Sequence, residues 1–328
     1  MNNTRALKLT YGAMLAAIFG MLMLLNRQTG GFLQGVLVFI LPIPMAIYAV
    51  RYGLRAGITV FIVMVASSFL FGDFTSVFYG ISSAFLGLVL GTRLNRHRDP
   101  MKTLILIMVL GMVLELFDML VIAYIATGET LDTDVREMQQ AMEQAFRMSE
   151  QITGQSMEQQ QSIISILTPD VLRRVMIVSI AAAGALDGFV VYTVSILIMR
   201  RLHIPVQKPA PVAQYYPPKW TGILGIGLFL LYNVTFSKPF ENELLQNIAQ
   251  MAGLAGYFYL MCFGVIAMIG VLQKYITKNH VLIVILALLS LMVLPSVDLI
   301  LGFLYISGSL HERLMERPSG SRDRFPKF

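Results

Sequence analysis

Charged side chains are scarce in this chain. Only 13% of its residues are charged, whereas 56% are hydrophobic, and a soluble globular chain carries about 25% charged residues. A chain this apolar cannot keep its surface out of water by folding on itself, so the composition excludes an ordinary soluble protein. The formal net charge of +6 does not indicate a nucleic-acid partner, because basic residues in a membrane protein set its orientation.

The residues and motifs of catalysis and metal binding are also nearly absent. The single cysteine, Cys262, excludes an intrachain disulfide. The four histidines lie far apart, at predicted helix ends or in loops, without the spacing of metal ligands. The sequence contains no P-loop, HExxH, GxSxG or CxxC motif. We therefore expect no cofactor, no metal, no ATPase and no enzymatic activity in this chain. The histidines are His97, His203, His280 and His311.

Long apolar runs are what the chain has in abundance. The central run, residues 175–199, is long enough to cross a hydrocarbon core of roughly 30 Å as a helix. The last run is broken by Pro295 and predicts either one long kinked helix or a short hairpin. We predict further spans over residues 9–25, 32–50, 56–71, 75–92, 103–126, 220–236, 244–272 and 281–310.

Two polar segments divide this pattern. Residues 204–219 are rich in proline, which makes a semi-rigid linker, and we place a domain boundary there. Residues 127–170 form the longest polar stretch, in which residues 134–154 have an apolar face typical of an amphipathic helix on the membrane or on the protein. We therefore predict an all-α polytopic membrane protein with about 8–10 spans. A six-helix domain (1–203), with the insertion 127–170, precedes the linker, a C-terminal helical unit (220–311) and a disordered basic tail (312–328).

Basic residues are distributed unevenly between the polar segments. They gather in one alternate set of these segments, which the positive-inside rule places in the cytoplasm. We therefore expect a multi-pass protein of the bacterial cytoplasmic membrane, with both termini in the cytoplasm. The basic set comprises residues 1–8, 51–55, 92–102, 200–219 and 274–278.

Carboxylates within predicted spans are the candidate functional residues. Glu115 lies near the middle of the fifth span and Asp187 near the middle of the sixth, and Asp118 shares a helix face with Glu115. Because consecutive spans run antiparallel, the three side chains can meet at similar depth. Charges at mid-membrane are costly and therefore mark functional sites. Two interpretations stay open, a cavity that binds a proton, cation or cationic substrate group, and a protonated hydrogen bond between helices.

Small residues on the first span suggest close helix packing. Gly12, Ala13, Ala16 and Ala17 have the spacing that lets another helix approach. Two interpretations are open here as well, packing within the same chain and docking on a separate subunit.

Two resemblances follow from these residues. The alanine-rich stretch on the first span, and residues 52–57 before the third, resemble the substrate-binding S components of energy-coupling factor (ECF) transporters. The whole chain resembles the YybS-like family of uncharacterised bacterial membrane proteins. The first resemblance implies a six-helix bundle that binds a small molecule, with ECF transmembrane and ATPase subunits as partners.

We therefore expect an integral membrane protein that binds or transports a small molecule, with the lipid bilayer as its surroundings. The alternative is a scaffold without transport activity that recruits partners through its outer segment and basic tail. An intramembrane aspartyl protease is a further class, because Asp118 and Asp187 lie on adjacent spans. However, residues 184–187 match the Gly-x-Gly-Asp signature of that class only loosely.

Overall fold

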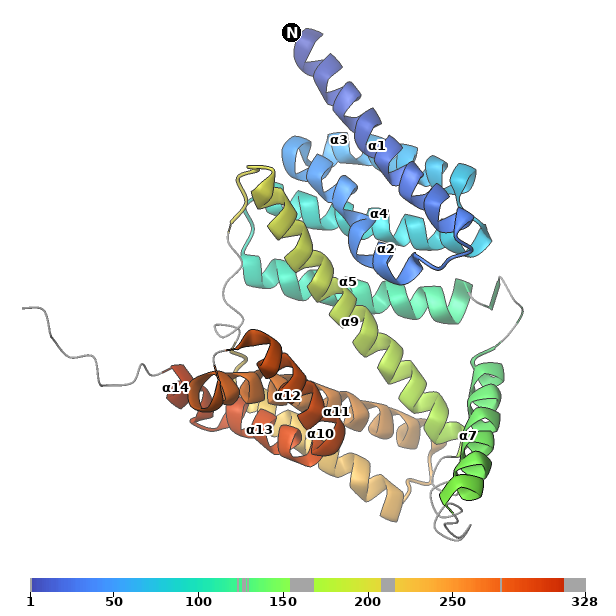
Figure 1. The fold of residues 1–328 in the computed structure, drawn as a ribbon, viewed down its shortest axis with the longest axis vertical. Helices are drawn as coiled ribbons and strands as arrows, with labels where there is room; N and C mark the ends of the chain where they lie inside the picture. Colours follow the sequence, from blue (N-terminus) through green and yellow to red (C-terminus); the bar gives the residue numbers. More distant parts are fainter. Residues whose placement is uncertain are drawn as a thin grey trace, which may run out of the picture. The chain divides into compact units, whose positions relative to one another are not determined.

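The structure is a computed structural model that describes residues 2–122, 124–125, 128, 130–153, 168–207, 216–277 and 279–315. These residues are helical, with short connections (Figure 1). Seven of their helices are long and apolar enough to cross a membrane, which confirms the prediction of an all-α polytopic membrane protein. The chain divides into two compact units, Met1–Ala210 and Pro211–Phe328. This division lies within the proline-rich segment 204–219.

Unit 1 contains the spans that precede the proline-rich segment. Three of its helices begin at a side chain that accepts a hydrogen bond from the first turn: Asp73 before α4, Asp99 before α5 and Thr168 before α9. Proline follows at the first position of α5 and α9, where it costs no hydrogen bond. The helices are α1 (Asn2–Gln28), α2 (Gln34–Ile40), α3 (Pro42–Phe71), α4 (Phe74–Asn95), α5 (Pro100–Phe117), the π-helical turn η1 (Asp118–Ile122), α7 (Leu131–Thr153) and α9 (Pro169–Arg201).

The helix α3 reverses direction in its middle. Gly53 has φ 76° and ψ −178°, a conformation essentially restricted to glycine. A Cβ on Gly57 would lie 3.6 Å from the Cβ of Ala49, although eight residues of straight helix would separate them by about 12 Å. The two halves of α3 are therefore antiparallel, as expected from the basic turn at residues 51–55. The candidate span Gln34–Phe71 thus consists of two antiparallel segments, which we count as two candidate crossings.

Contacts with α4 confirm the reversal. Positions 87 and 91 of α4 lie against Pro42 and Ala46, so α4 runs parallel to the first half of α3. Position 80 lies against Ser68 and Leu88 against position 57, so α4 runs antiparallel to the second half. The Asn95 side-chain amide donates to the Val50 carbonyl at 2.8 Å, beside the broken turn. This bond satisfies a carbonyl that the helix break leaves without its usual partner.

The helices α4 and α9 end in the same way, each with a histidine in the left-handed conformation. His97 has φ 47° and His203 has φ 55°. In each case the amides of the histidine and of the next residue bond to carbonyls of the last turn, the pattern of a Schellman cap. Glycine is usual at this position, because a side chain there costs roughly 1–2 kcal/mol.

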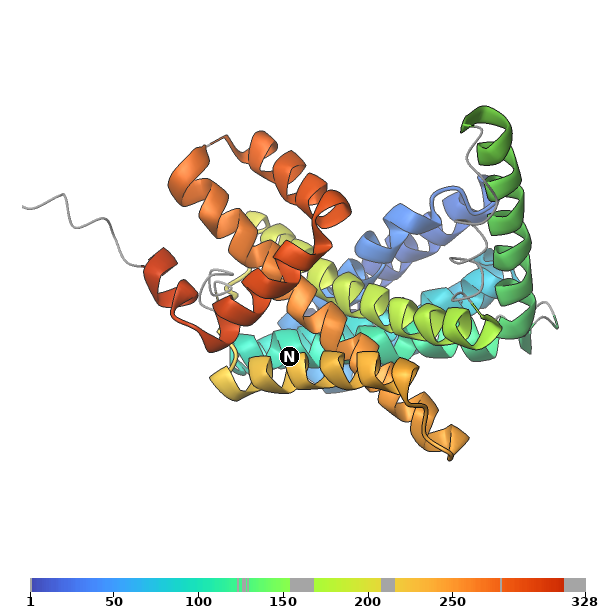
Figure 2. The same ribbon diagram turned by 90° about the horizontal axis from the view of Figure 1, so that it is seen from below.

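The amphipathic helix of the insertion is α7. It packs beside the start of α9 (Figure 2), where Val135 is buried and the Arg173 Nε donates to Asp132 at 2.8 Å. Of the two expected positions, on the membrane or on the protein, the structure shows contact with the protein. Residues 154–167 of the insertion lie outside the described residues.

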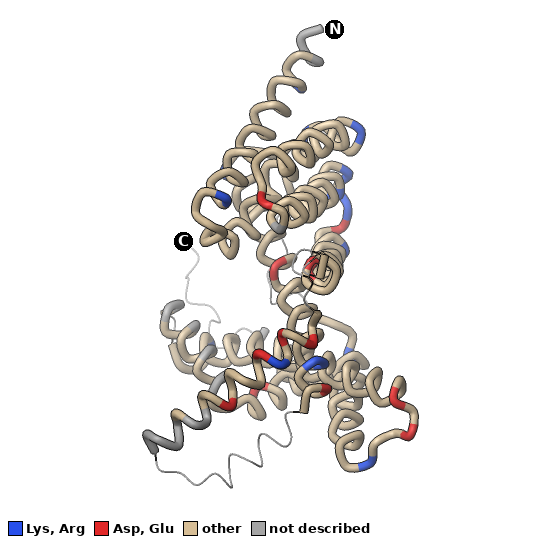
Figure 3. The backbone as a smooth tube through the Cα atoms, turned by 90° about the vertical axis from the view of Figure 1, so that its right-hand side faces the viewer, with Lys and Arg blue, Asp and Glu red and all other residues tan. Residues whose placement is uncertain are grey.

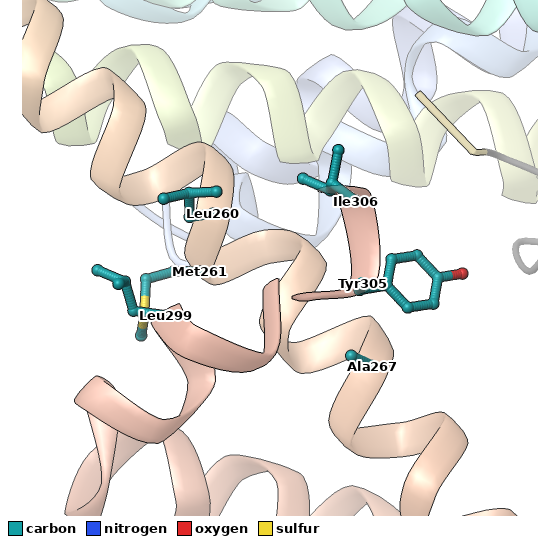
Figure 4. Packing of buried hydrophobic residues seen from close by; sticks show 6 residues of the cluster. All are labelled: Leu260, Met261, Ala267, Leu299, Tyr305 and Ile306. Carbon is teal, nitrogen blue, oxygen red and sulfur yellow. The ribbon is translucent and has the colours of Figure 1, made fainter. Parts of the chain in front are cut away.

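Unit 2 is built around a close contact between α11 and α13. Figure 4 shows Leu260 and Met261 of α11 beside Leu299 of α13 in its buried core. Gly264 and Gly302 let the two backbones touch, because a Cβ at either position would overlap the backbone of the other helix. The helices are α10 (Lys219–Ser237), α11 (Glu243–Val271), the π-helical turn η3 (Leu272–Ile276), α12 (His280–Val293), α13 (Pro295–Ser307) and α14 (Leu310–Met315).

The last apolar run is bent rather than straight. The segment Ile285–Leu291 of α12 and the helix α13 are bent by 105° at the break before Pro295, a geometry that agrees with both expected forms, a kinked helix and a short hairpin. The short helix α14 includes residues 312–315, so the predicted disordered tail begins too early. The remaining residues, 316–328, lie outside the described part of the chain.

Asp298 is completely buried in unit 2, with 0% of its surface exposed. It lies in the first turn of α13, and the Ser290 hydroxyl of α12 contacts both carboxylate oxygens at 3.0 and 2.9 Å. This contact fastens α12 to α13 across the bend.

Candidate functional site

Glycines bring α5 and α9 together at the depth of the carboxylates. A Cβ on Gly184 would lie 2.6 Å from the Gly111 carbonyl oxygen and 2.7 Å from the Glu115 Cβ. One turn on, a Cβ on Gly188 would lie 2.6 Å from the Ile107 carbonyl oxygen. Backbones can approach this closely only where side chains are missing. Asp187 lies in the same turn of α9 and lines a pocket together with residues of α5.

The three candidate carboxylates line one pocket. Glu115 comes from α5, Asp118 from the start of η1, and Asp187 from α9. All three are half-buried, so none points fully into lipid. The chain changes from α- to π-helical winding at Asp118, and such π-helical segments are frequent at functional sites. The structure therefore brings together the three residues that the sequence selected.

Hydroxyl groups of α4 complete the polar lining. Tyr79, Ser82 and Ser83 face the carboxylates, and the Ser82 hydroxyl donates to Asp118 at 3.2 Å. Sequence reasoning missed these three residues. Their spacing at i, i+3 and i+4 in an apolar helix was the available signal, because it places all of them on one face.

The size and lining of the pocket limit what it can hold. Its volume is about 40 Å³, enough for one or a few water molecules. The described residues that line it include no lysine, arginine or histidine. Among the described residues, no three His, Cys, Asp or Glu side chains are placed to hold a metal ion, and this includes the three carboxylates of the pocket. The lining suits a proton, or one cationic group of a solute with hydrogen-bond donors.

The small residues of α1 do not form one free surface. Gly12 and Ala16 are buried, and a Cβ on Gly12 would lie 2.8 Å from Val60 of α3. Ala13 and Ala17 are exposed. Of the two interpretations, packing within the same chain describes Gly12 and Ala16, whereas docking on a separate subunit stays a prediction for Ala13 and Ala17. The cause is helical geometry, since adjacent residues point about 100° apart.

Comparison with known proteins agrees with this architecture. The family model described as "Predicted membrane protein (DUF2232)" matches residues 17–306. The chain belongs to this family. It is also 24% identical over 257 residues to "Uncharacterized protein YybS" of Bacillus subtilis (strain 168), which covers 76% of this chain and 78% of that protein. No solved structure matches the chain.

The family match spans both units, including α10, α11 and most of α13. The C-terminal unit is therefore part of the family's architecture and not an appendage to a six-helix bundle. The resemblance to the YybS-like family is confirmed, whereas the resemblance to ECF S components stays a prediction.

Proposed function

We propose that unit 1 binds and transports a small solute through the pocket that Glu115, Asp118 and Asp187 line. The observation that carries this proposal is the convergence of three half-buried carboxylates from two neighbouring spans on one cavity. A purely structural carboxylate in a membrane is sealed by its partners, as Asp298 is. Ionisable groups that line a cavity between helices are instead typical of solute and proton pathways.

The chemistry of the lining defines the class of solute. Three carboxylates without a basic partner among the lining residues favour an organic cation such as an amine, or a proton. Because the pocket holds about 40 Å³, only the charged group of such a solute fits the present conformation. Entry of a whole solute requires α5 or α9 to move away from α4.

Binding of radiolabelled organic amines to purified protein, together with proton flux in proteoliposomes that contain a pH-sensitive dye, tests the proposal. We expect the wild type to bind at least one amine or to conduct protons. Asp187→Asn, which preserves shape and hydrogen bonding, should lower binding or flux at least about tenfold, because a charge-assisted contact is lost.

Asp298→Asn is the matched control, since it makes the same change at a carboxylate outside the pocket. It should retain binding and flux if the variant elutes as a single species from size exclusion. Equal activity of Asp187→Asn and the wild type in every assay would contradict the proposal. Activity that depends on the tail after residue 315, and not on the carboxylates, would favour the scaffold instead.

An energy-coupling partner is a separate part of the proposal. Ala13 and Ala17 lie on the exposed face of α1, so they are the positions at which a partner helix can dock. Ala13→Leu with Ala17→Leu should prevent co-purification of ECF transmembrane and ATPase subunits while amine binding persists. Failure of wild-type protein to retain any such subunit would remove the partner without affecting the pocket.

A further inference from the structure

A second, larger pocket lies at the basic end of unit 1. Its volume is about 340 Å³, within the range of small-molecule sites. Three segments form it: the middle of α3 with Arg51, the end of α4 with Asn95 and His97, and the exit of α9 with His203 and Pro205. It shares no lining residue with the carboxylate pocket.

The two histidines are the unusual feature of this pocket. Each occupies the left-handed position of a helix cap where glycine is favoured, with φ of 47° and 55°. Neither side chain is needed for the cap, because the cap bonds are made by backbone amides. Two helices thus end in a histidine where glycine is usual, and the exposed side chains of both histidines line one cavity. Strained positions of this kind cluster at functional sites.

Two side chains that line the pocket, Arg51 and Asn95, contact neighbouring groups that restrict their motion. Arg51 is exposed, and its guanidinium lies 4.9 Å from the centre of the Tyr11 ring of α1, a cation–π contact that restricts its motion beside the pocket. The amide of Asn95 is held by the Val50 carbonyl, which fixes the α3 turn against the end of α4.

Charge decides which ligand the pocket attracts. The carboxyl ends of α4 and α9 contribute roughly −0.5 charge each, which would favour a cation. Arg51 in the lining, Arg93 in the last turn of α4, and Arg200 and Arg201 in the last turn of α9 contribute full positive charges. Figure 3 shows Lys and Arg gathered at the helix ends on one side of unit 1. Asp99, two residues after His97, adds one negative charge. The four arginines still outweigh this carboxylate and the two helix ends, so the net charge near the pocket is positive and favours an anion.

We propose that this pocket binds a phosphate group. The planar fork of arginine matches phosphate geometry, and imidazole N–H groups add neutral or charged donors. The group is carried either by an anionic phospholipid head or by a soluble phosphate. Basic pockets between helix ends are known to recognise lipid head groups.

Two binding assays on the full chain in mild detergent test the two sources separately, native mass spectrometry for the lipid and equilibrium dialysis for inorganic phosphate. One arm adds phosphatidylglycerol, with phosphatidylcholine as the neutral comparison, and the other measures retention of radiolabelled inorganic phosphate by equilibrium dialysis. The variants are Arg51→Gln and the double variant His97→Gly with His203→Gly. The double variant favours the cap conformation, so its thermal stability should be equal to or higher than that of the wild type.

Both variants should weaken retention of the bound probe at least about tenfold, because each loses hydrogen bonds to a charged group. Arg27→Gln is the charge-matched control, since Arg27 is exposed in the last turn of α1, outside the pocket. It should retain the probe fully. Loss with phosphatidylglycerol alone identifies a lipid site, and loss with inorganic phosphate alone identifies a soluble ligand.

Two results would overturn the proposal. One is equal retention of both probes by the wild type, Arg51→Gln and the histidine double variant. The other is an equal loss in Arg27→Gln and Arg51→Gln, which would show that general basic charge, and not the pocket, retains the probe.

Discussion

The carboxylates within apolar helices have different surroundings in the two units. In unit 1, Glu115, Asp118 and Asp187 remain half-buried and share a cavity with hydroxyl groups. In unit 2, Asp298 has no exposed surface, and a single hydroxyl, Ser290, contacts both of its oxygens. All four carboxylates lie in apolar helices, and what separates them is access to a cavity.

Packing explains why the units differ. In both, glycines bring two helices into backbone contact. In unit 1 a third helix, α4, faces this contact with side chains of different sizes and leaves a cavity. In unit 2 the bent segment α12–α13 folds its own serine onto the carboxylate and closes the space.

Gly264→Ala should cause the largest loss of stability, because it disturbs the packing of α11 against α13 in unit 2. The new Cβ would overlap the backbone of Asp298, so we expect a stability loss of about 3 kcal/mol, measured by SDS titration in mixed micelles. Gly227→Ala is the matched control in α10, because nothing lies within 4 Å of its Cβ position. It should be neutral or stabilising by about 0.5–1 kcal/mol, and a similar loss in both variants would contradict this account.

Removal of one hydroxyl group from each unit should have the next largest effect on stability. Ser290→Ala leaves a sealed carboxylate without its donor and should cost about 1–3 kcal/mol. Ser82→Ala removes a donor from Asp118, whose half-buried position admits water, and should cost less than about 1 kcal/mol. The same unfolding titration compares them, and the reverse order would show that the unit 1 pocket is the sealed one.

Chemical labelling measures access directly. A hydrophobic carbodiimide should modify at least one of Glu115, Asp118 and Asp187 about tenfold more than Asp298, because a fully buried group reacts only after local opening. Peptide mass spectrometry after mild treatment gives the ratio for each site. Labelling of Asp298 at an equal rate would remove the contrast between the units.

The smallest effect concerns the contact between α7 and α9. The Arg173–Asp132 pair is exposed, at 43% and 47% of the two side chains, so Arg173→Ala should cost about 0.2–1 kcal/mol. High salt should reduce this difference further. A larger loss would mean that α7 is essential for the stability of unit 1, which the exposed pair does not suggest.

Much of the helical architecture could be predicted from the sequence, because an apolar run of span length has few alternatives in a membrane. The three carboxylates could be selected for the same reason, since a charge in such a run is costly wherever it lies. The turn at Gly53 was also predictable, because basic residues and glycines separate two runs.

The remaining features depend on rotation about helix axes and on bends, which hydropathy does not determine. The sequence placed Gly12 and Ala13 on one surface, whereas the structure buries the first and exposes the second. It gave no sign that the 105° bend would close Ser290 over Asp298. The backbone conformations of His97 and His203 have no local sequence signal.

The reversal at Gly53 also changes the number of membrane crossings that unit 1 is expected to make. Helix length alone registers Gln34–Phe71 as one span, which would give unit 1 an odd number of passages through the bilayer. Counting its antiparallel halves separately makes the number even, which predicts that the beginning of α1 and the exit of α9 lie in the same aqueous compartment. The α7 segment, between the fifth and sixth passages, then faces the opposite one, and reporter fusions at these three points would read the difference directly.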